Sequence, residues 1–482
     1  MPAMRERSPG MRLLFVALVG AVLAIPLLMV YALVYDRQDQ ASTAQGAINA
    51  GWGGPQVIAG PLLVVPFRTV QTQTEEVAGK PVTRAVEVEK LLYVSPLSNR
   101  VTTRILPQER RKSIYRSVLY EAQVGGTAKF ALPADLARFG VSRDSLLWDR
   151  AELRIGASDA RGLTRGGTLM ADGVALPLQP GKGPAAAGGQ GFFAFLPWDG
   201  AGELAVDYGF GLRGSRSLSL VPRGGRTQWA VASSWQSPSF GGAFLPETRQ
   251  LGDKGFAASY TIDKLALGQP PVATEDPGPP QIDEGGGEYL TPSVRDATAT
   301  SATEGGVQEV VGGPARAVTV ALLEPVNLYS KVNRSVKYGF LFIGFTFLAF
   351  FLFDVVGGAR VAAAEYLLTG AALVLFFVLL LAFAEVIGFT PAYLLASAAI
   401  IGLLSAYSAA VLKSWRRGRF IAALLVGLYA LLFVLLNLEA WSLLIGSVLL
   451  FAALAGVMYA TRNVDWASVG RREGVDESPT PT

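Results

Sequence analysis

Apolar and polar stretches alternate along this chain on a scale much longer than a single helical turn. Residues 13–35 form an uncharged apolar run of 23 residues. At 1.5 Å per residue, a helix of that length exceeds the roughly 30 Å hydrocarbon core of a bilayer. Residues 36–336 are polar by comparison, and the chain is then apolar almost to its end. The pattern predicts one membrane-spanning helix near the N-terminus and a group of spans after residue 336.

The first apolar run has two interpretations, a retained anchor and a cleaved signal peptide. The apolar part of a signal peptide is about 7–15 residues long and is followed by a small-residue cleavage site. Residues 13–35 are longer and lack such a site, which favours an anchor with a kink at Pro26. The C-terminal region predicts five further spans, at 338–356, 365–384, 391–412, 420–437 and 441–460.

Lysine and arginine predict the orientation, because they are concentrated in cytoplasmic loops. With the N-terminus inside, six spans place eleven basic residues in the cytoplasm and none in the two short outer loops. Lys331, Arg334 and Lys337, just outside the second span, are the exception. We therefore expect a multi-pass protein of the bacterial inner membrane, with both termini cytoplasmic and the large polar region in the periplasm.

Within the polar region, short segments rich in β-branched and aromatic residues are separated by Gly and Pro. Six such segments stand out: 61–67, 85–94, 113–124, 151–158, 217–222 and 315–326. Many short strands with such turns predict an antiparallel sandwich or barrel. Residues 268–314 are instead dominated by Pro, Gly, Thr and acids, which predicts a disordered insert. Deleting 270–310 is accordingly expected to leave the fold intact.

The predicted fold is a membrane protein with an N-terminal transmembrane helix, a large β-rich, sandwich-like periplasmic domain and a C-terminal bundle of five transmembrane helices. Residues 1–36 would form the cytoplasmic tail and first helix, and 37–336 the β-rich domain. Residues 337–466 would form the five-helix bundle, and 467–482 a cytoplasmic tail.

Composition excludes much chemistry. Hydrophobic residues make up 51% of the 482 residues and charged residues 17%, as expected for a membrane protein. The chain has no Cys and no His, which removes disulfides, thiolate zinc sites, Cys nucleophiles and Ser-His-Asp triads. The net charge of +4 gives no case for nucleic acid as a partner. We predict no catalytic, cofactor-binding or metal-binding residues and no cofactor.

Three short motifs have ordinary structural interpretations. Residues 209–214 match G-x-G-x-x-G, but the alternating segment that follows predicts a strand rather than the helix a dinucleotide site needs. Residues 180–184, PGKGP, lack the spacing of a phosphate-binding loop and predict a plain loop. Residues 333–335, NRS, match a glycosylation sequon beside a span, and we expect no modification.

Acidic residues offer a weak case for chemistry. Two of the carboxylates in the external region could form an acid/base pair. We expect these side chains instead to lie on the solvated surface: Asp149, Glu152, Asp159, Glu203 and Asp207. In the spans, all acids map near helix ends, at Asp354, Glu365, Glu385 and Glu439. Ion-coupled transporters usually carry ionisable groups at membrane depth, so this pattern argues against one. Two stripes of small residues either let helices approach closely or arise by chance: 398/402/406/410 and 452/456/460.

The segment SSWQSPSFGGAFLP places three large aromatics between glycines and prolines. Because Pro cannot donate to a strand ladder, we expect a structured loop at Trp235, Pro238, Phe240, Phe244 and Pro246. Two roles remain open. The aromatics either plug the end of the sandwich or form an exposed contact surface for an envelope partner.

Several long segments resemble the CreD family of bacterial inner-membrane proteins. In the membrane region these are 337–354, 365–389 and 428–466; in the external region they are 51–67, 148–163 and 233–260. The chain departs from the family at three places: Val386 stands where members usually have His, residues 362–364 are all Ala where His-Pro is common, and Ser113 replaces Gly. The resemblance implies an envelope-integrity protein of the CreB/CreC two-component regulon, associated with β-lactam and colicin tolerance, and no catalytic residues.

Three function classes follow. The first is a non-enzymatic envelope-maintenance protein, whose partners would be the lipid bilayer and an unknown envelope component or membrane protein. The second is a carrier or channel for a lipid or envelope precursor, which a continuous polar cavity between the helices would favour. The third is a carboxylate-dependent periplasmic hydrolase, which two acids converging in a cleft, one with a raised pKa, would favour.

Overall fold

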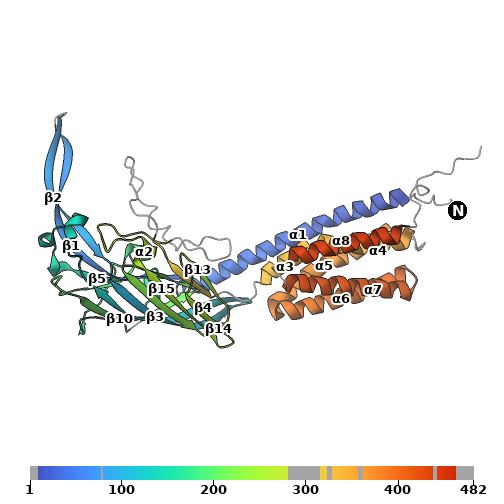
Figure 1. Cartoon of the computed structure of the whole chain (residues 1–482). Helices are drawn as coiled ribbons and strands as arrows, with labels where there is room; N and C mark the ends of the chain where they lie inside the picture. The colour runs from blue at the N-terminus through green and yellow to red at the C-terminus, as the bar shows by residue number, and fades with distance from the viewer. Residues whose placement is uncertain are drawn as a thin grey trace, which may run out of the picture. The chain divides into compact units, whose positions relative to one another are not determined.

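The computed structural model describes residues 9–77, 80–164, 166–280, 315–322, 328–355, 362–437 and 442–462. It divides into two compact units (Figure 1). One comprises Met1–Ser42 and Val326–Thr482, and the other comprises Thr43–Pro325. The first unit is helical and the second is built from β-strands, so we call them the helical unit and the β unit.

The first sheet of the β unit, sheet A, is centred on the long strand β1. The strands of this sheet are β13 (Pro238–Gly242), β17 (Val318–Leu322), β11 (Ser217–Val221), β1 (Gln56–Val77), β5 (Glu152–Ala157), β9 (Gly191–Phe195), β8 (Gln179–Pro180), β2 (Lys80–Val94) and β16 (Val272–Ala273). On one side, the start of β1 pairs with β11, and its later part pairs with β2. A register shift between Ala59 and Leu62 marks the change.

The second sheet, sheet B, runs almost entirely antiparallel. In spatial order its strands are β14 (Thr248–Gly252), β15 (Gly255–Asp263), β12 (Arg226–Ser233), β3 (Ser98–Lys112), β4 (Tyr115–Phe130), β10 (Leu204–Ser215), β6 (Thr168–Ala171) and β7 (Val174–Ala175). Side chains alternate along each strand, so one face of each sheet turns inward. Leu63 and Val65 from sheet A meet Val101 and Trp229 from sheet B in one hydrophobic core.

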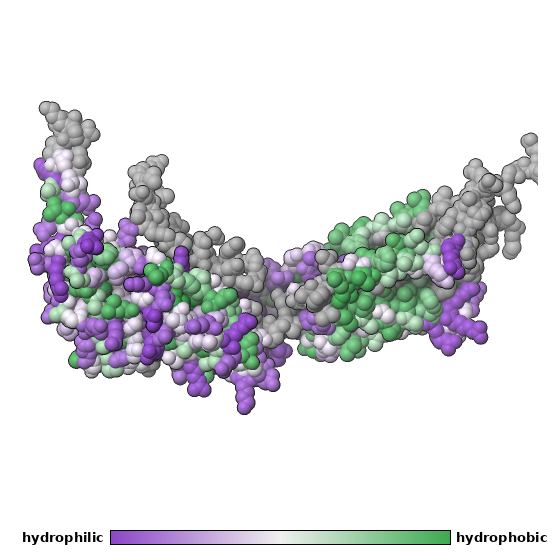
Figure 2. All heavy atoms as spheres, in the orientation of Figure 1, coloured by the Kyte–Doolittle hydropathy of each residue, from purple (hydrophilic) through white to green (hydrophobic). Residues whose placement is uncertain are grey.

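Over the residues that the structure describes, the helical unit contains seven helices. They are α1 (Pro9–Ala50), α3 (Leu328–Lys337), α4 (Gly339–Val355), α5 (Ala363–Ile387), α6 (Phe389–Val411), α7 (Trp415–Asn437) and α8 (Ser442–Thr461). The face of these helices seen in Figure 2 is largely hydrophobic along the middle of their length and hydrophilic near their ends. Their core is rich in aromatic side chains, including Phe376, Tyr393 and Tyr429.

The structure confirms an apolar N-terminal helix, a large β-rich region and apolar C-terminal helices. Among the described residues, five helical segments are long and apolar enough to cross a membrane: Leu14–Ala50, Leu328–Phe351, Ala364–Ile387, Phe389–Val411 and Trp415–Asn437. The sixth predicted span coincides with α8, whose described apolar part, Leu444–Gly456, is shorter. The six-span count therefore stays a prediction.

The predicted disordered insert is wrong over residues 268–280. Val272 is 1% exposed, and β16 pairs with β2 there, so a few apolar residues in a Pro-rich segment suffice to dock it. Residues 281–314 lie outside the described part of the chain. Just before this stretch, the Gly278 carbonyl accepts a hydrogen bond of 3.1 Å from the Ala315 amide just after it. The two ends of the stretch are therefore close together.

Candidate functional site

A group of charged side chains is buried on the face of sheet A that points away from the sandwich core. Glu152 and Arg154 lie on this face of β5, while the intervening Leu153 points into the core. The Glu152 carboxylate is 2.8 Å from an Arg154 guanidinium nitrogen and 2.6 Å from Lys182 Nζ. Only 8% of the Glu152 side chain is exposed. A buried carboxylate of this kind requires such paired cations.

Lys182 comes from the PGKGP loop, which the sequence presents as an unremarkable turn. Its backbone has a φ of +48°, a conformation rare for a non-glycine residue. Its ammonium nitrogen reaches Glu152 and also lies 4.7 Å from the centre of the Phe193 ring. The loop thus supplies a cation to the buried carboxylate. Sequence analysis missed this role, because the motif was compared only with phosphate-binding loops.

A second buried pair lies in the same region of the β unit. Arg223, which follows β11, forms an ion pair with Asp276, and the two side chains are 5% and 7% exposed. The second Asp276 carboxylate oxygen accepts a hydrogen bond of 2.6 Å from the Ala185 amide. Asp276 therefore fastens both the segment after β16 and the short helix Ala185–Ala187 to sheet A. Gly156 permits this approach, because a Cβ there would lie 2.5 Å from the Ala187 Cβ.

The charged side chains of this group affect the pKa of Tyr93 on β2. Its pKa is raised, first by burial and then by the negative charge of Asp276. Arg154 and Arg223 oppose this shift, so Tyr93 lies within electrostatic reach of both ion pairs. At neutral pH the phenol remains protonated.

The arrangement is charge-compensated and does not resemble an acid/base site. Glu152 and Asp276 each have a cation at contact distance, so each carboxylate is engaged in an ion pair of its own. Buried pairs of this kind hold segments in place, and removing one partner is costly. Among the described residues, no three acidic side chains gather in a way that could hold a metal ion.

The other candidate carboxylates are not brought together. Asp159 binds Arg161 through two hydrogen bonds, which keep the pKa of Asp159 below its usual range. Glu203 lies 3.6 Å from Lys129 on the exposed surface. Asp207 belongs to β10 of sheet B, and Asp149 to a short helical turn. The alternative of an acid/base pair therefore finds no support among these residues, whereas the expected surface position is wrong for Glu152, which is buried.

The G-x-G-x-x-G motif lies inside β10, as the strand prediction requires. Residues 204–215 pair along their whole length with β4. The motif is therefore part of a strand and does not begin the helix that would bind the phosphates of a dinucleotide. The glycines make room for large neighbours, because a Cβ on Gly214 would lie 2.4 Å from the Tyr120 hydroxyl. The NRS sequon belongs to α3, where Arg334 donates a 3.2 Å hydrogen bond to the Leu436 carbonyl.

The aromatic segment adopts a conformation that differs in part from the expected loop. Residues 238–242 form β13, which pairs with β17 at the edge of sheet A, where the amide-less nitrogen of Pro238 is tolerated. Trp235, Phe240 and Phe244 are half-buried and pack against the sandwich core. The Phe240 ring meets Phe256 edge-on with centroids 5.7 Å apart. These contacts favour the plug over the exposed contact surface.

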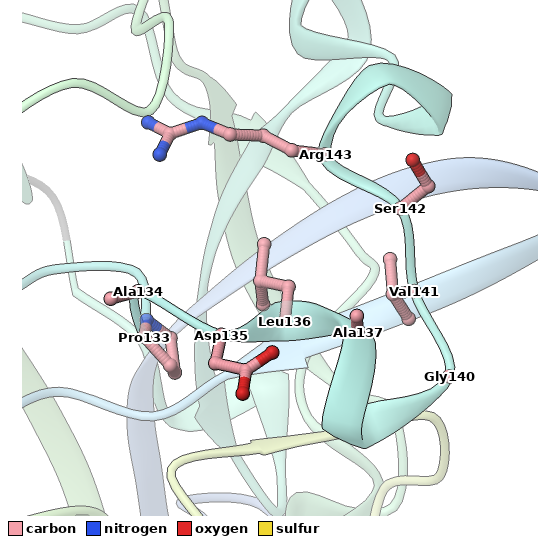
Figure 3. Close-up of a pocket in the computed structure, with 9 residues that line it drawn as sticks. All are labelled: Pro133, Ala134, Asp135, Leu136, Ala137, Gly140, Val141, Ser142 and Arg143. Atoms are coloured by element: carbon pink, nitrogen blue, oxygen red, sulfur yellow. The ribbon is translucent and has the colours of Figure 1, made fainter.

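A shallow hollow lies beside the short helix Leu136–Phe139 (Figure 3). One acidic and one basic side chain line the hollow, Asp135 and Arg143, and the two point away from each other (Figure 3). Asp135 instead pairs with Arg138 at 2.6 Å, and Arg143 donates a 2.7 Å hydrogen bond to the Gly200 carbonyl. The hollow therefore lacks the convergent polar groups that a small-molecule site needs.

The β1–β2 hairpin projects from sheet A as a narrow two-stranded arm (Figure 1). Among the β1 residues whose side chains are described, Phe67 is the last that is buried, whereas the pairing continues to Val77 opposite Lys80. These ten further residues extend the ribbon by about 30 Å at 3.3 Å per residue. Val70 is 67% exposed, and Val86, on the opposite face, is 38% exposed. We call residues 68–77 and 80–90 the arm.

Within the helical unit, α3 binds the C-terminal end of α7. Lys331 Nζ lies 3.2 Å from the Asn437 amide oxygen, and Arg334 donates to the Leu436 carbonyl. A helix C-terminus attracts cations, because its last carbonyls are unpaired. Lys331 and Arg334 were two of the three basic residues that did not fit the predicted concentration of Lys and Arg in cytoplasmic loops. These contacts give both a structural role.

Ionisable residues of the described parts of α4 to α7 lie near helix ends. Glu365 begins α5 and accepts a 2.7 Å hydrogen bond from the Ala362 amide, while Glu385 ends α5 and accepts one of 3.2 Å from the Tyr329 hydroxyl. Asp354 is the penultimate residue of α4, and Glu439 lies outside the described residues. The stripe at 398/402/406/410 is exposed within this chain. Close approach occurs instead at Gly418, where a Cβ would lie 2.7 Å from that of Ala409.

These features define a membrane protein in which a β-sandwich is inserted between the first apolar helix and the helices that follow. A sequence model described as "Inner membrane protein CreD" matches residues 8–467. The inner membrane protein CreD of Escherichia coli K12 is 31% identical over 462 residues, covering 93% of this chain and 92% of that protein. The chain therefore belongs to the CreD family of inner-membrane proteins.

A likeness to solved structures is faint. The crystal structure of a proposed protease from Parabacteroides distasonis covers 53% of this chain and 46% of its own, at 9% identity and a TM-score of 0.20. Similarity at that level carries no argument about fold or activity.

Proposed function

We propose that this inner-membrane protein supports the integrity of the cell envelope without catalysing a reaction. In this proposal the apolar helices anchor the chain, and the β unit lies in the periplasm, as the distribution of Lys and Arg favours. The arm then contacts an envelope component, either a membrane protein or another constituent of the periplasm. The link to envelope stress and to β-lactam or colicin tolerance follows from the CreD resemblance.

The observation that carries this proposal is the arm. An isolated two-stranded ribbon is only marginally stable in water, and both of its edges present unpaired backbone groups. Beyond Phe67 the described side chains of β1 are not buried, and an ion pair between Glu89 and Arg150 joins the base of the arm to the sandwich. The charged residues Arg68, Glu87 and Glu89 along the arm protect against aggregation. A polar ribbon with exposed valines on both faces is suited to pairing with, or lying against, another surface.

The charged group on sheet A supports the non-enzymatic part of the proposal. Its two carboxylates are both engaged by cations, so the strongest candidate for acid/base chemistry in the β unit serves to hold the fold together. The position of ionisable residues at the ends of α4 to α7 argues against a proton- or ion-coupled carrier.

Site-specific crosslinking in living cells tests the contact. A photoreactive amino acid placed at Val70 or at Val86 samples the two faces of the arm. The same amino acid at Gln250, on the exposed edge strand β14, is the control. We expect a discrete crosslinked species from at least one arm position and none from Gln250. An equal yield from all three positions, or none from the arm, would contradict the proposal.

A further inference from the structure

Both chain connections leave the β unit at the same end. On the N-terminal side, Gln45 Nε2 donates a 2.8 Å hydrogen bond to the Arg116 carbonyl, and Ser117 Oγ donates one of 2.7 Å to Asn49 Oδ1. On the C-terminal side, the Leu322 amide donates one of 2.7 Å to the Arg216 carbonyl. The Arg216 amide in turn donates to Val118, which ties the two exits to neighbouring strands.

The short connections between the β unit and the apolar helices keep this end near the membrane. The apolar run ends at Tyr35, and the β unit begins at Thr43. At the other exit, β17 ends at Leu322 and α3 begins at Leu328. A chain spans at most about 3.6 Å per residue, so each exit lies within roughly 20–30 Å of a membrane helix. This bound holds for any arrangement of the two units.

The same end is strongly basic. Six exposed cations gather on the β3–β4 hairpin and on the connection from β10 to β11: Arg110, Arg111, Lys112, Arg116, Arg213 and Arg216. We call them the basic collar. Two acids accompany them: Glu109, and Glu121, which pairs with Arg213 at 3.1 Å. Arg111 lies directly opposite Arg116 across the two strands. Like charges in that position are destabilising, and a bound anion would relieve them.

Apolar and aromatic side chains lie among these cations. Trp52 has the Arg110 guanidinium 4.6 Å from its ring centre and the Arg213 guanidinium 4.5 Å from it. Ile114, at the hairpin turn, is 40% exposed, and Tyr115 follows it. Tryptophan, tyrosine and basic side chains together are typical of the membrane–water interface. Exposing the Ile114 side chain to water at the tip of a charged hairpin is unfavourable, and contact with a bilayer would remove that cost.

We propose that the basic collar binds the phosphate groups of anionic phospholipids in the membrane that the chain itself crosses. Guanidinium groups suit phosphate, because they can donate two parallel hydrogen bonds to it. The negative surface potential of a bilayer that contains anionic lipid attracts each basic residue within about a Debye length. The contact would orient the β unit on the bilayer surface. It does not depend on which envelope component meets the arm.

The absence of Cys from the chain permits a direct test in the full-length protein. Ser113→Cys, in the exposed hairpin turn, carries a fluorophore, and a trace lipid with a nitroxide on its headgroup quenches it. The protein is reconstituted in nanodiscs of phosphatidylcholine, with or without roughly one-third phosphatidylglycerol. We expect quenching to rise at least about threefold with phosphatidylglycerol and to fall in high salt.

Charge reversal supplies the matched comparison. In Ser113→Cys protein, the triple change Arg110→Glu, Arg111→Glu and Lys112→Glu should abolish the rise. Arg100→Glu, Lys129→Glu and Lys264→Glu make the same change in charge at the other end of the sandwich and should leave it intact. Quenching that does not depend on phosphatidylglycerol in the unreversed protein would overturn the proposal. So would a rise that survives the collar reversal.

Discussion

Arg223 and Asp276, 53 residues apart in the chain, form an ion pair in which both side chains are more than nine-tenths buried. Asp276 follows a Pro-rich stretch that has little capacity to enter a core. The pair fixes this stretch against sheet A, together with the hydrogen bond from the Ala185 amide. A single buried carboxylate thus ties the described part of this polar segment to sheet A.

Asp276→Ala should destabilise the β unit by about 3–5 kcal/mol, because it leaves the Arg223 charge buried without a partner. The midpoint of thermal unfolding of the full chain in detergent measures the effect. Asp263→Ala removes the same group from an exposed pair with Arg226 and should cost less than about 1 kcal/mol. Arg223→Met combined with Asp276→Leu should restore most of the stability. Equal effects of the two Asp→Ala changes would show that burial of the pair is unimportant.

Two deletions of the polar segment should behave differently. Replacing residues 281–314 by a short Gly linker should leave the protein folded and in the membrane, because Gly278 and Ala315 are already hydrogen-bonded. Deleting 270–310 should lower its abundance, because Val272 and Asp276 are lost with it. Immunoblotting of membrane fractions compares the two. Normal levels of the larger deletion would contradict the structural role of these residues.

The plug formed by Trp235, Phe240 and Phe244 should be sensitive to truncation. Phe240→Ala removes the contact with Phe256 and should cost about 2–3 kcal/mol, less than for a fully buried ring, with lower protein abundance. Leu245→Ala, at a side chain that is 70% exposed, is the control and should have little effect. If Phe240→Ala left abundance normal and impaired only envelope tolerance, the segment would be a contact surface instead.

Reporter fusions test the orientation. A reporter active only in the periplasm should be active when fused after Asn437 and silent when fused within residues 413–419, because the basic residues of that loop favour the cytoplasm. The same prediction places the β unit in the periplasm. The reverse pair of results would invert the topology and remove the arm from the periplasm.

Periodicity and apolar length were enough to predict the main elements. The runs at 13–35 and after residue 336 became helices, and the segment at 85–94 lies in β2, as its alternating pattern predicts. The helix α1 continues to Ala50, beyond the predicted span, because its polar extension contains no Pro and has a single Gly, Gly46, before Gly51. The thickness of the bilayer limits the length of a membrane span, but the helix that contains the span can continue beyond the bilayer.

The charged group on sheet A could not be predicted in the same way. Glu152 was singled out from the sequence as a surface acid, and Arg154 lies two residues after it on β5, whereas Lys182, Arg223 and Asp276 come from separate segments. Only the sheet topology brings these residues together. The arm was hidden for a related reason, since its strand pattern resembles that of any sheet. Its projection depends on which strands lie beside β1 and β2, which no local pattern reveals; in the sheet, β16 pairs with β2 only at Tyr93 and Val94.

Shortening the arm is the sharpest test of whether it connects the anchored β unit to the envelope. Residues 69–88 are replaced by a two-residue Asn-Gly turn, which keeps the pairing of Arg68 with Glu89 and leaves the sandwich core untouched. Envelope tolerance, scored as growth on β-lactam and detergent, is compared with membrane abundance in cells that lack the native protein. We predict normal abundance with tolerance reduced to that of cells without the protein. Full tolerance from the shortened chain would contradict the account.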